Sequence, residues 1–226
     1  MSHKWQGVRG LVGENPAVEL ATSDLMKAAD WAAERWAAFP AQRWDATDTT
    51  VEWTPRRTLD HLVDAMLLYS AYVATRARER VSPPRNGDPS SAPGALMDAF
   101  RSGIVILTRL LDGFRDDERA YHPSGMADRS GWIGMACTEI LVHTEDATGG
   151  GDTPAEPFPV ALADAVVDRV LPWAPRDGNG WERLFWATGR ASLGGRPPEP
   201  SDWWWQSAPL AEWDGKPCRR TSPPQW

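Results

Sequence analysis

The chain has 226 residues, a formal net charge of −7 at pH 7 and a pI near 5.1, which argue against nucleic acid or anionic membrane as partners because both require a concentrated basic surface. The length suits one bundle-sized domain with a smaller appendage, which we place at residues 1–157 and 158–226. No apolar run approaches the roughly 18 residues of a membrane-spanning helix and the N-terminus lacks a signal-peptide core, so we expect a cytoplasmic protein that acts on small molecules.

The first predicted helix covers about residues 22–39 and follows a loosely held lead-in at 7–16. A Thr-Ser pair can cap it, Asp24 lies in its first turn, and Pro40 ends it. Its apolar positions recur at helical spacing: Leu25, Ala28, Ala29, Ala32, Trp36 and Phe39. The polar, threonine-rich stretch 40–53 then predicts a linker or a short hairpin.

A second helix is predicted from residue 55 to about residue 81. Thr54 can serve as its N-cap, and the proline that follows fits the first helical position, where a backbone N–H is not needed. His61 lies on a stripe of this helix that is otherwise apolar, where a lone histidine is most often a core residue. Asp64, one turn further on, could orient its imidazole.

Two connections and a third helix follow. Residues 81–93 are rich in Pro, Gly and Asn and predict a surface loop. A third helix over 94–114 carries the apolar stripe of a bundle helix: Leu96, Met97, Phe100, Ile104, Leu107 and Leu111. Residues 115–130 form a charged, glycine-containing connection to the fourth helix.

The fourth helix begins near Trp132 and ends at the glycines 149–151, which start a linker to residue 159. Glu139 and His143 are four residues apart and so only about 40° apart around the axis, and Asp146 falls on the same stripe. Apolar residues cover most of the other faces, so we expect the helix to be largely buried. Ionisable groups are rarely buried unless they are paired or bind a metal, which makes Glu139 and His143 candidate ligands of one ion.

A third ligand is sought among the remaining histidines, of which the chain has three. His3 lies in a terminus that we expect to fray, and His122 precedes a proline in a loop-like segment. His61 is therefore the natural partner of Glu139 and His143. The simpler interpretation is a hydrogen-bonded Glu-His pair without metal.

Cysteine usage indicates the redox compartment, and arginine usage indicates the kind of genome. Cys137 and Cys218 are far apart in sequence, which fits a reducing compartment better than a disulfide scaffold. Cys137 falls about 160° from Glu139 around the fourth helix, so we predict a core thiol and not a ligand or nucleophile. The chain has 21 Arg against 3 Lys, which we interpret as the mark of a GC-rich bacterial genome.

The C-terminal region differs from the bundle in character. Short helices are predicted over 160–171 and 181–190, and one or two strands over 201–215 with a turn at the Asp-Gly pair. Trp203, Trp204 and Trp205 can line a pocket or, as we favour, fasten a small domain to its neighbour. Arg190 and Arg196 could grip a substrate carboxylate, although a solvated loop is the plainer interpretation.

The second-helix start, EWTPRRTLDHL over 52–62, followed by EILVHTEDA over 139–147, resembles the DinB-like superfamily. The resemblance covers roughly residues 20–150. Within that superfamily, the sequence is similar to the branch of mycothiol-dependent maleylpyruvate isomerases and mycothiol S-transferases. It implies a mainly α protein, a DinB-like four-helix bundle with a small α+β C-terminal cap that packs over a metal site. It also implies that His61, Glu139 and His143 are the ligands of zinc or another divalent ion.

Three protein ligands leave a tetrahedral zinc ion one open position, as in catalytic sites. A thiol bound there is held as the thiolate, so no protein nucleophile is required. The resemblance implies a small thiol, mycothiol or a similar one, as cosubstrate with a small electrophile, in isomerisation or S-transfer. We expect Asp64 and Asp146 to orient ligands, and Tyr72, Trp132 and Arg190 are candidates for substrate contact.

Two other functions stay open. A metallohydrolase would bind water at the same position, but the chain lacks a glutamate base between two ligand histidines. A non-catalytic bundle that binds a small molecule would keep the site without turnover. The sequence also leaves the oligomeric state open, a homodimer being one option.

Overall fold

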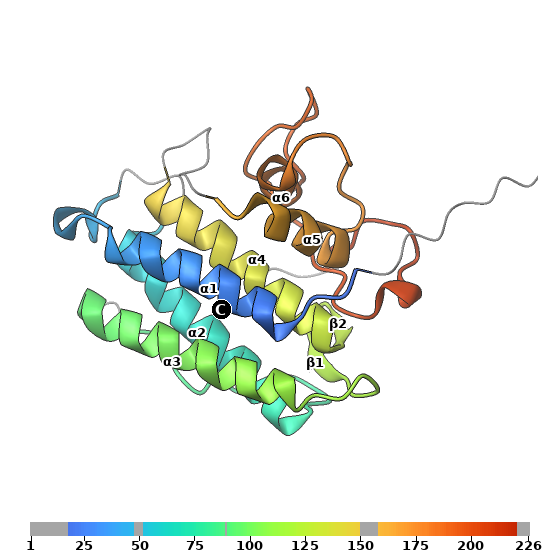
Figure 1. Ribbon diagram of the computed structural model, residues 1–226, viewed down its shortest axis with the longest axis horizontal. Coiled ribbons are helices and arrows are strands. Elements are labelled where there is room, and N and C mark those ends of the chain that lie inside the picture. The colour runs from blue at the N-terminus through green and yellow to red at the C-terminus, as the bar shows by residue number, and fades with distance from the viewer. Residues whose placement is uncertain (1–17, 48–51, 89, 150–157, 221–226) are drawn as a thin grey trace, which may run out of the picture.

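The structure, a computed structural model, describes residues 18–47, 52–88, 90–149 and 158–220. Helices make up most of this part of the chain and are arranged as a bundle with a smaller C-terminal portion beside it (Figure 1). This agrees with the predicted mainly α class, a four-helix bundle with a small cap. The predicted lead-in at 7–16, His3 and most of the linker 149–159 lie outside the described residues.

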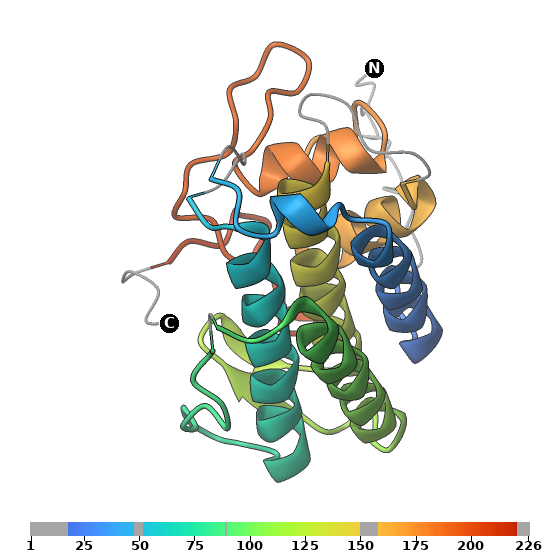
Figure 2. The same ribbon diagram turned by 90° about the vertical axis from the view of Figure 1, so that its left-hand side faces the viewer.

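The bundle consists of α1 (Thr22–Ala37), α2 (Pro55–Thr75), α3 (Pro93–Asp112) and α4 (Arg129–Thr148). The helix α1 packs against α3 and α4, and α2 packs against the same two helices, which closes the ring of four (Figure 2). α4 is buried around nearly its whole circumference, as predicted.

Side-chain contacts fix the directions of the helices. Arg56 at the start of α2 donates to the carbonyl of Ser91 just before α3 (2.8 Å), so these two helices begin at the same end of the bundle. Trp36 near the end of α1 donates to Thr144 near the end of α4 (3.1 Å), so these two end together. Of these two parallel pairs, only α2 and α3 follow each other in the chain, so their connection must run back along the bundle.

The segment between α2 and α3 follows the outer side of α2. The helix ends at Thr75, not near residue 81 as predicted, because Arg76 adopts a left-handed conformation (φ 49°) and closes it. The carboxylate of Asp60 is fully buried and accepts from the guanidinium of Arg85 and the backbone N–H of Asp88. Asp64 binds the same arginine (2.5 Å).

Two short strands, which the sequence analysis missed, lie in the connection before α4. β1 (Ala120–His122) pairs antiparallel with β2 (Gly125–Ala127), with Tyr121 opposite Met126. The backbone N–H of Tyr121 also donates to the carbonyl of Ala77 just after α2 (2.8 Å). His122 is therefore a buried strand residue and not the loop residue that was predicted.

The C-terminal portion, which we call the cap, contains α5 (Val160–Val170) and α6 (Gly180–Ala187) and packs on α4 through α5. Arg169 is almost fully buried and ties the cap to the bundle, because its guanidinium binds Ser130 (3.0 Å), the Gln206 carbonyl (3.1 Å) and Asp128. One hydrophobic core runs through both parts. The division at residues 157 and 158 stays a prediction.

The strands predicted over 201–215 are wrong. Within the described residues this segment pairs only at an isolated bridge between Trp203 and Arg219, and a short 3-10 helix occupies Leu210–Glu212. Its backbone is used elsewhere: the N–H of Trp204 donates to Cys218 (2.9 Å) and that of Gln206 to Val170 (2.8 Å). These bonds dock the segment on the cap and on α5.

A glycine inside α4 permits the close approach of α5. A Cβ at Gly134 would lie 2.5 Å from a methyl group of Val170. We expect Gly134→Ala to destabilise the protein by about 1–3 kcal/mol through overpacking, although alanine is the better helix former. Urea unfolding measures this, with Gly94→Ala as the control because nothing lies within 4 Å of its added Cβ. Equal effects of the two changes would contradict the packing argument.

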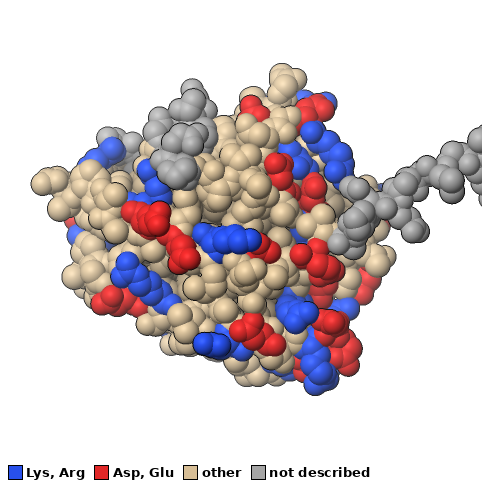
Figure 3. All heavy atoms as spheres, viewed as in Figure 1, with Lys and Arg blue, Asp and Glu red and all other residues tan. Residues whose placement is uncertain are grey.

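The surface fits the composition. Lys and Arg are interspersed with Asp and Glu over the face in Figure 3, without a field of one sign. Among the described residues, no helix combines the length and the apolar character needed to cross a bilayer.

Candidate metal centre

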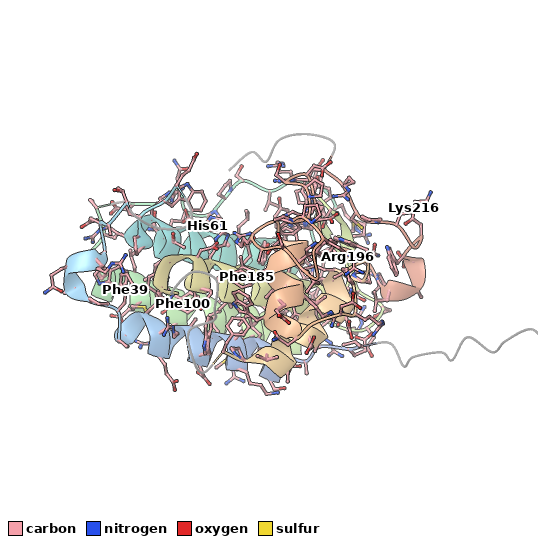
Figure 4. All side chains as sticks on the ribbon, turned by 90° about the horizontal axis from the view of Figure 1, so that it is seen from above. Phe39, His61, Phe100, Phe185, Arg196 and Lys216 are labelled. Carbon is pink, nitrogen blue, oxygen red and sulfur yellow. The ribbon has the colours of Figure 1, made fainter. Side chains whose placement is uncertain are left out.

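Three side chains predicted as metal ligands meet between α2 and α4. His61 comes from the second turn of α2 (Figure 4), and Glu139 and His143 come from successive turns of α4. Oε2 of Glu139 lies 3.3 Å from Nε2 of His61 and 3.1 Å from Nε2 of His143. One donor atom from each residue falls within 4.8 Å of the others, and the three side chains are largely buried.

This donor set fits a divalent ion of the zinc type. Two imidazole nitrogens and a carboxylate oxygen are common zinc ligands. With bonds of ~2.0–2.1 Å, a tetrahedral ion holds its ligand atoms about 3.3–3.4 Å apart. The Glu139 oxygen lies at nearly this separation from both imidazole nitrogens, and a cavity borders the three residues, so the fourth position can be open.

The electrostatics of the centre favour the charged carboxylate. Burial alone would raise the pKa of Glu139, but hydrogen bonds with His143 and His61 outweigh it and hold this pKa well below its usual range. Burial would lower the pKa of His143, yet its close contacts with the carboxylates of Asp146 and Glu139 raise it to about 9. Glu139 is thus a carboxylate ready to bind a cation.

Asp146 lies behind His143, on the side away from Glu139. Its Oδ2 is 3.4 Å from Nδ1 of His143, within ion-pair distance but outside hydrogen-bond geometry. A carboxylate on this side of a metal-binding imidazole can set its tautomer and direction. Arg190 of the cap holds this carboxylate with two nitrogens, Nε at 2.8 Å from Oδ1 and Nη2 at 2.7 Å from Oδ2. The cap therefore reaches a candidate ligand of α4 through one buried carboxylate.

The other residues predicted for the site have different surroundings. Asp64 was predicted to orient the imidazole of His61. It instead binds Arg85 on the outer side of α2. Tyr72 and Trp132 are buried and stack on each other with ring centroids 5.9 Å apart, away from the cavity wall. Arg196 pairs with Asp177 (2.7 Å) on the cap surface.

Tyr69 and His122 connect the candidate metal centre to the hydrophobic core. The hydroxyl of Tyr69 donates to the other oxygen of Glu139 (3.4 Å), and its ring meets His122 edge to face. The backbone N–H of Ser124 donates to Nδ1 of His122 (3.1 Å). The sequence analysis missed Tyr69 because it lies two turns from His61 among other apolar residues of α2.

A cavity of about 290 Å³ opens above the three candidate ligands. Its walls include Trp53, before α2, and several residues of the cap. The Trp53 ring lies 5.0 Å from that of His61 and stacks on that of His143 at 6.0 Å. The remaining lining from the cap includes Thr188, Arg190, Trp203, Trp204, Trp205 and Arg220.

Comparison with known proteins gives the fold. No protein-family model and no curated protein sequence matches the chain. A crystal structure of the mycothiol-dependent maleylpyruvate isomerase superposes with a TM-score of 0.58 at 10% identity, over 79% of this chain and 94% of that chain. A histidine-to-alanine mutant of that isomerase gives 0.53, also at 10% identity, over 76% and 72%.

The chain has the fold of these isomerase structures. The predicted resemblance is thereby confirmed at the level of the fold, including the part beyond the bundle, since the match extends over most of both chains. At 10% identity the likeness carries no statement about activity.

The thiol Cys137 is fully buried on the other side of α4, and its pKa is raised by burial, in keeping with the predicted core thiol.

The buried His122 predicts a pH dependence of stability. Burial lowers its pKa from 6.5 to about 3, so between these values only the unfolded chain binds the proton. Its contribution to stability is complete above pH 6.5 and is lost as the pH falls, by about 2 kcal/mol between pH 6.5 and 5.0. Urea unfolding of wild type and His122→Phe, both with excess chelator, should show this loss in wild type alone. Parallel pH profiles would mean that folded His122 takes up the proton.

Proposed function

We propose that this protein is a zinc-dependent enzyme that activates a low-molecular-weight thiol, mycothiol or one like it, for isomerisation of a small electrophile or for S-transfer to it. The observation that supports this most is the convergence of His61, Glu139 and His143 at the floor of an open cavity. The shared fold with a mycothiol-dependent isomerase is consistent with it. The zinc ion, when bound, would supply a site that lowers the pKa of a thiol.

Each residue of the site would have a distinct role. The two imidazoles and the carboxylate bind the ion, and Asp146 keeps Nδ1 of His143 protonated and Nε2 directed at the ion. Tyr69 occupies the second oxygen of Glu139 with a hydrogen bond, which favours one-oxygen binding by this carboxylate. Trp53 covers the imidazoles and limits access of water.

The proposal is tested by metal content and by thiol-dependent turnover. Purified wild type should contain about one zinc per chain, and His61→Ala should lose it while circular dichroism shows an unchanged helical content. Wild type should then convert maleylpyruvate, or an S-acceptor such as 1-chloro-2,4-dinitrobenzene, only when mycothiol and zinc are both present.

Each other result has a distinct meaning. Absence of zinc in wild type after reconstitution would overturn the metal site. Turnover of an ester or amide without thiol would support a metallohydrolase, and tight retention of a ligand without product would support a binding protein.

A further inference from the structure

The cavity above the candidate metal centre has an aromatic wall. Trp203, Trp204 and Trp205 of the cap line it, and Trp53 lies on the bundle side. Trp205 is buried and packs edge to face on Trp203 (5.1 Å), whereas Trp203 and Trp204 are only partly buried. Indole faces that border a cavity offer stacking surface to a planar ligand.

The charges around the cavity leave one cation for a ligand. Of the two arginines in its lining, Arg190 is held by both oxygens of Asp146. Arg220 lies over the ring of Trp204 at 5.8 Å and donates to the carbonyl of Ser201. Among the described residues no carboxylate lies within ion-pair distance of Arg220, so its positive charge is not neutralised by a protein anion there.

The guanidinium of Arg220 lies at cation–π distance from the indole of Trp204, and its planar set of N–H donors can bind a carboxylate. Trp204 and Arg220 together thus form an aromatic face beside a cationic edge. The cavity volume of about 290 Å³ is just below the usual range for ligand sites, roughly 300–1,000 Å³, which favours a compact ligand.

We propose that the electrophile is a planar aromatic or conjugated molecule with a single negative charge, its ring on Trp204 and its anionic group at Arg220. This inference rests on the proposed function, because the ligand is an electrophile only if the protein activates a thiol. The binding preference itself does not need the thiol. A second negative charge would find no further unneutralised arginine in the described lining.

Binding of four probes by isothermal titration calorimetry tests the proposal: cinnamate, its neutral amide, 3-cyclohexylpropanoate and 4-carboxycinnamate. The full chain is titrated with zinc and after chelation, because a carboxylate can also bind zinc. Cinnamate should bind about tenfold more tightly than each of the other three in both forms.

Two substitutions show which side chains produce the binding preference for cinnamate. Arg220→Gln should abolish the advantage of cinnamate over its amide, and Trp204→Leu its advantage over the cyclohexyl analogue. Arg196→Gln and Trp213→Leu are matched controls outside the cavity lining and should bind as wild type does.

Two results would overturn the inference: equal binding of cinnamate and 3-cyclohexylpropanoate in wild type, or tightest binding of the dianion. Because no thiol is present, these results do not depend on catalysis. Thiol-dependent turnover without aromatic preference would overturn this inference alone, and aromatic preference without thiol reactivity would overturn the proposed function alone.

Discussion

Glu139→Gln is expected to weaken zinc binding by about 10²–10³-fold. Structural zinc sites with four ligands gain about 10–16 kcal/mol on binding, so one ligand accounts for roughly 3–4 kcal/mol. The amide keeps the shape of the carboxylate but loses the charge that lies between His61 and His143. Competition with a chelating dye measures the affinity.

The change should also remove the effect of zinc on stability. At a free zinc concentration of 1,000 times Kd, the ion stabilises wild type by about 4 kcal/mol, and the variant should gain far less at the same concentration. Glu145→Gln is the matched control, since Glu145 is a buried glutamate of the same helix outside the ligand set. Unchanged zinc stabilisation in Glu139→Gln would place the ion elsewhere.

The candidate ligands could be found from the sequence because they obey local rules. Glu139 and His143 share a helix face by their spacing, and only four histidines had to be considered for the third position. The structure brings His61 to the other two. Metal binding by the three residues stays a prediction.

The surroundings of the site depend on contacts between distant segments. Arg190 meets Asp146 across 44 residues, and Trp53 covers the imidazoles from a connection without helical periodicity. No spacing rule relates such residues, so a sequence offers no signal for them. Arg190 lines the cavity, but its guanidinium is held by Asp146, a partner that the sequence does not reveal. Substrate contact by Arg190 stays a prediction.

The helices were predicted well and the irregular segments poorly. Apolar periodicity and the Thr54 cap locate α1 to α4 to within a few residues, apart from the end of α2. That end is set by Arg76, which adopts the left-handed conformation. A helix end is usually marked in a sequence by Gly or Pro, and Arg76 is neither. The tryptophans at 203–205 have high strand propensity, but the hydrogen bonds that dock this segment on the cap and on α5 override it.

Arg190→Gln is expected to destabilise the protein by about 2–3 kcal/mol and to weaken zinc binding by about 10–100-fold. The carboxylate of Asp146 is almost fully buried and would lose its two-nitrogen partner. It would then bind His143 in a less defined geometry, so the imidazole would direct Nε2 less well at the ion. Urea unfolding of the metal-free protein and zinc titration measure the two effects separately.

The double variant Arg190→Gln/Asp146→Asn separates charge from positioning. Removing the buried carboxylate should restore part of the stability, because no unpaired charge remains, but not the zinc affinity, because an amide is a poorer acceptor for His143. Arg183→Gln is the control: this arginine pairs with Asp164 and Asp168 inside the cap, so its loss loosens the cap without touching α4 ligands. An equal fall in zinc affinity in Arg183→Gln would mean that the cap acts through its general stability. A fall confined to Arg190→Gln would make cap docking and metal binding two linked equilibria, coupled through a single carboxylate.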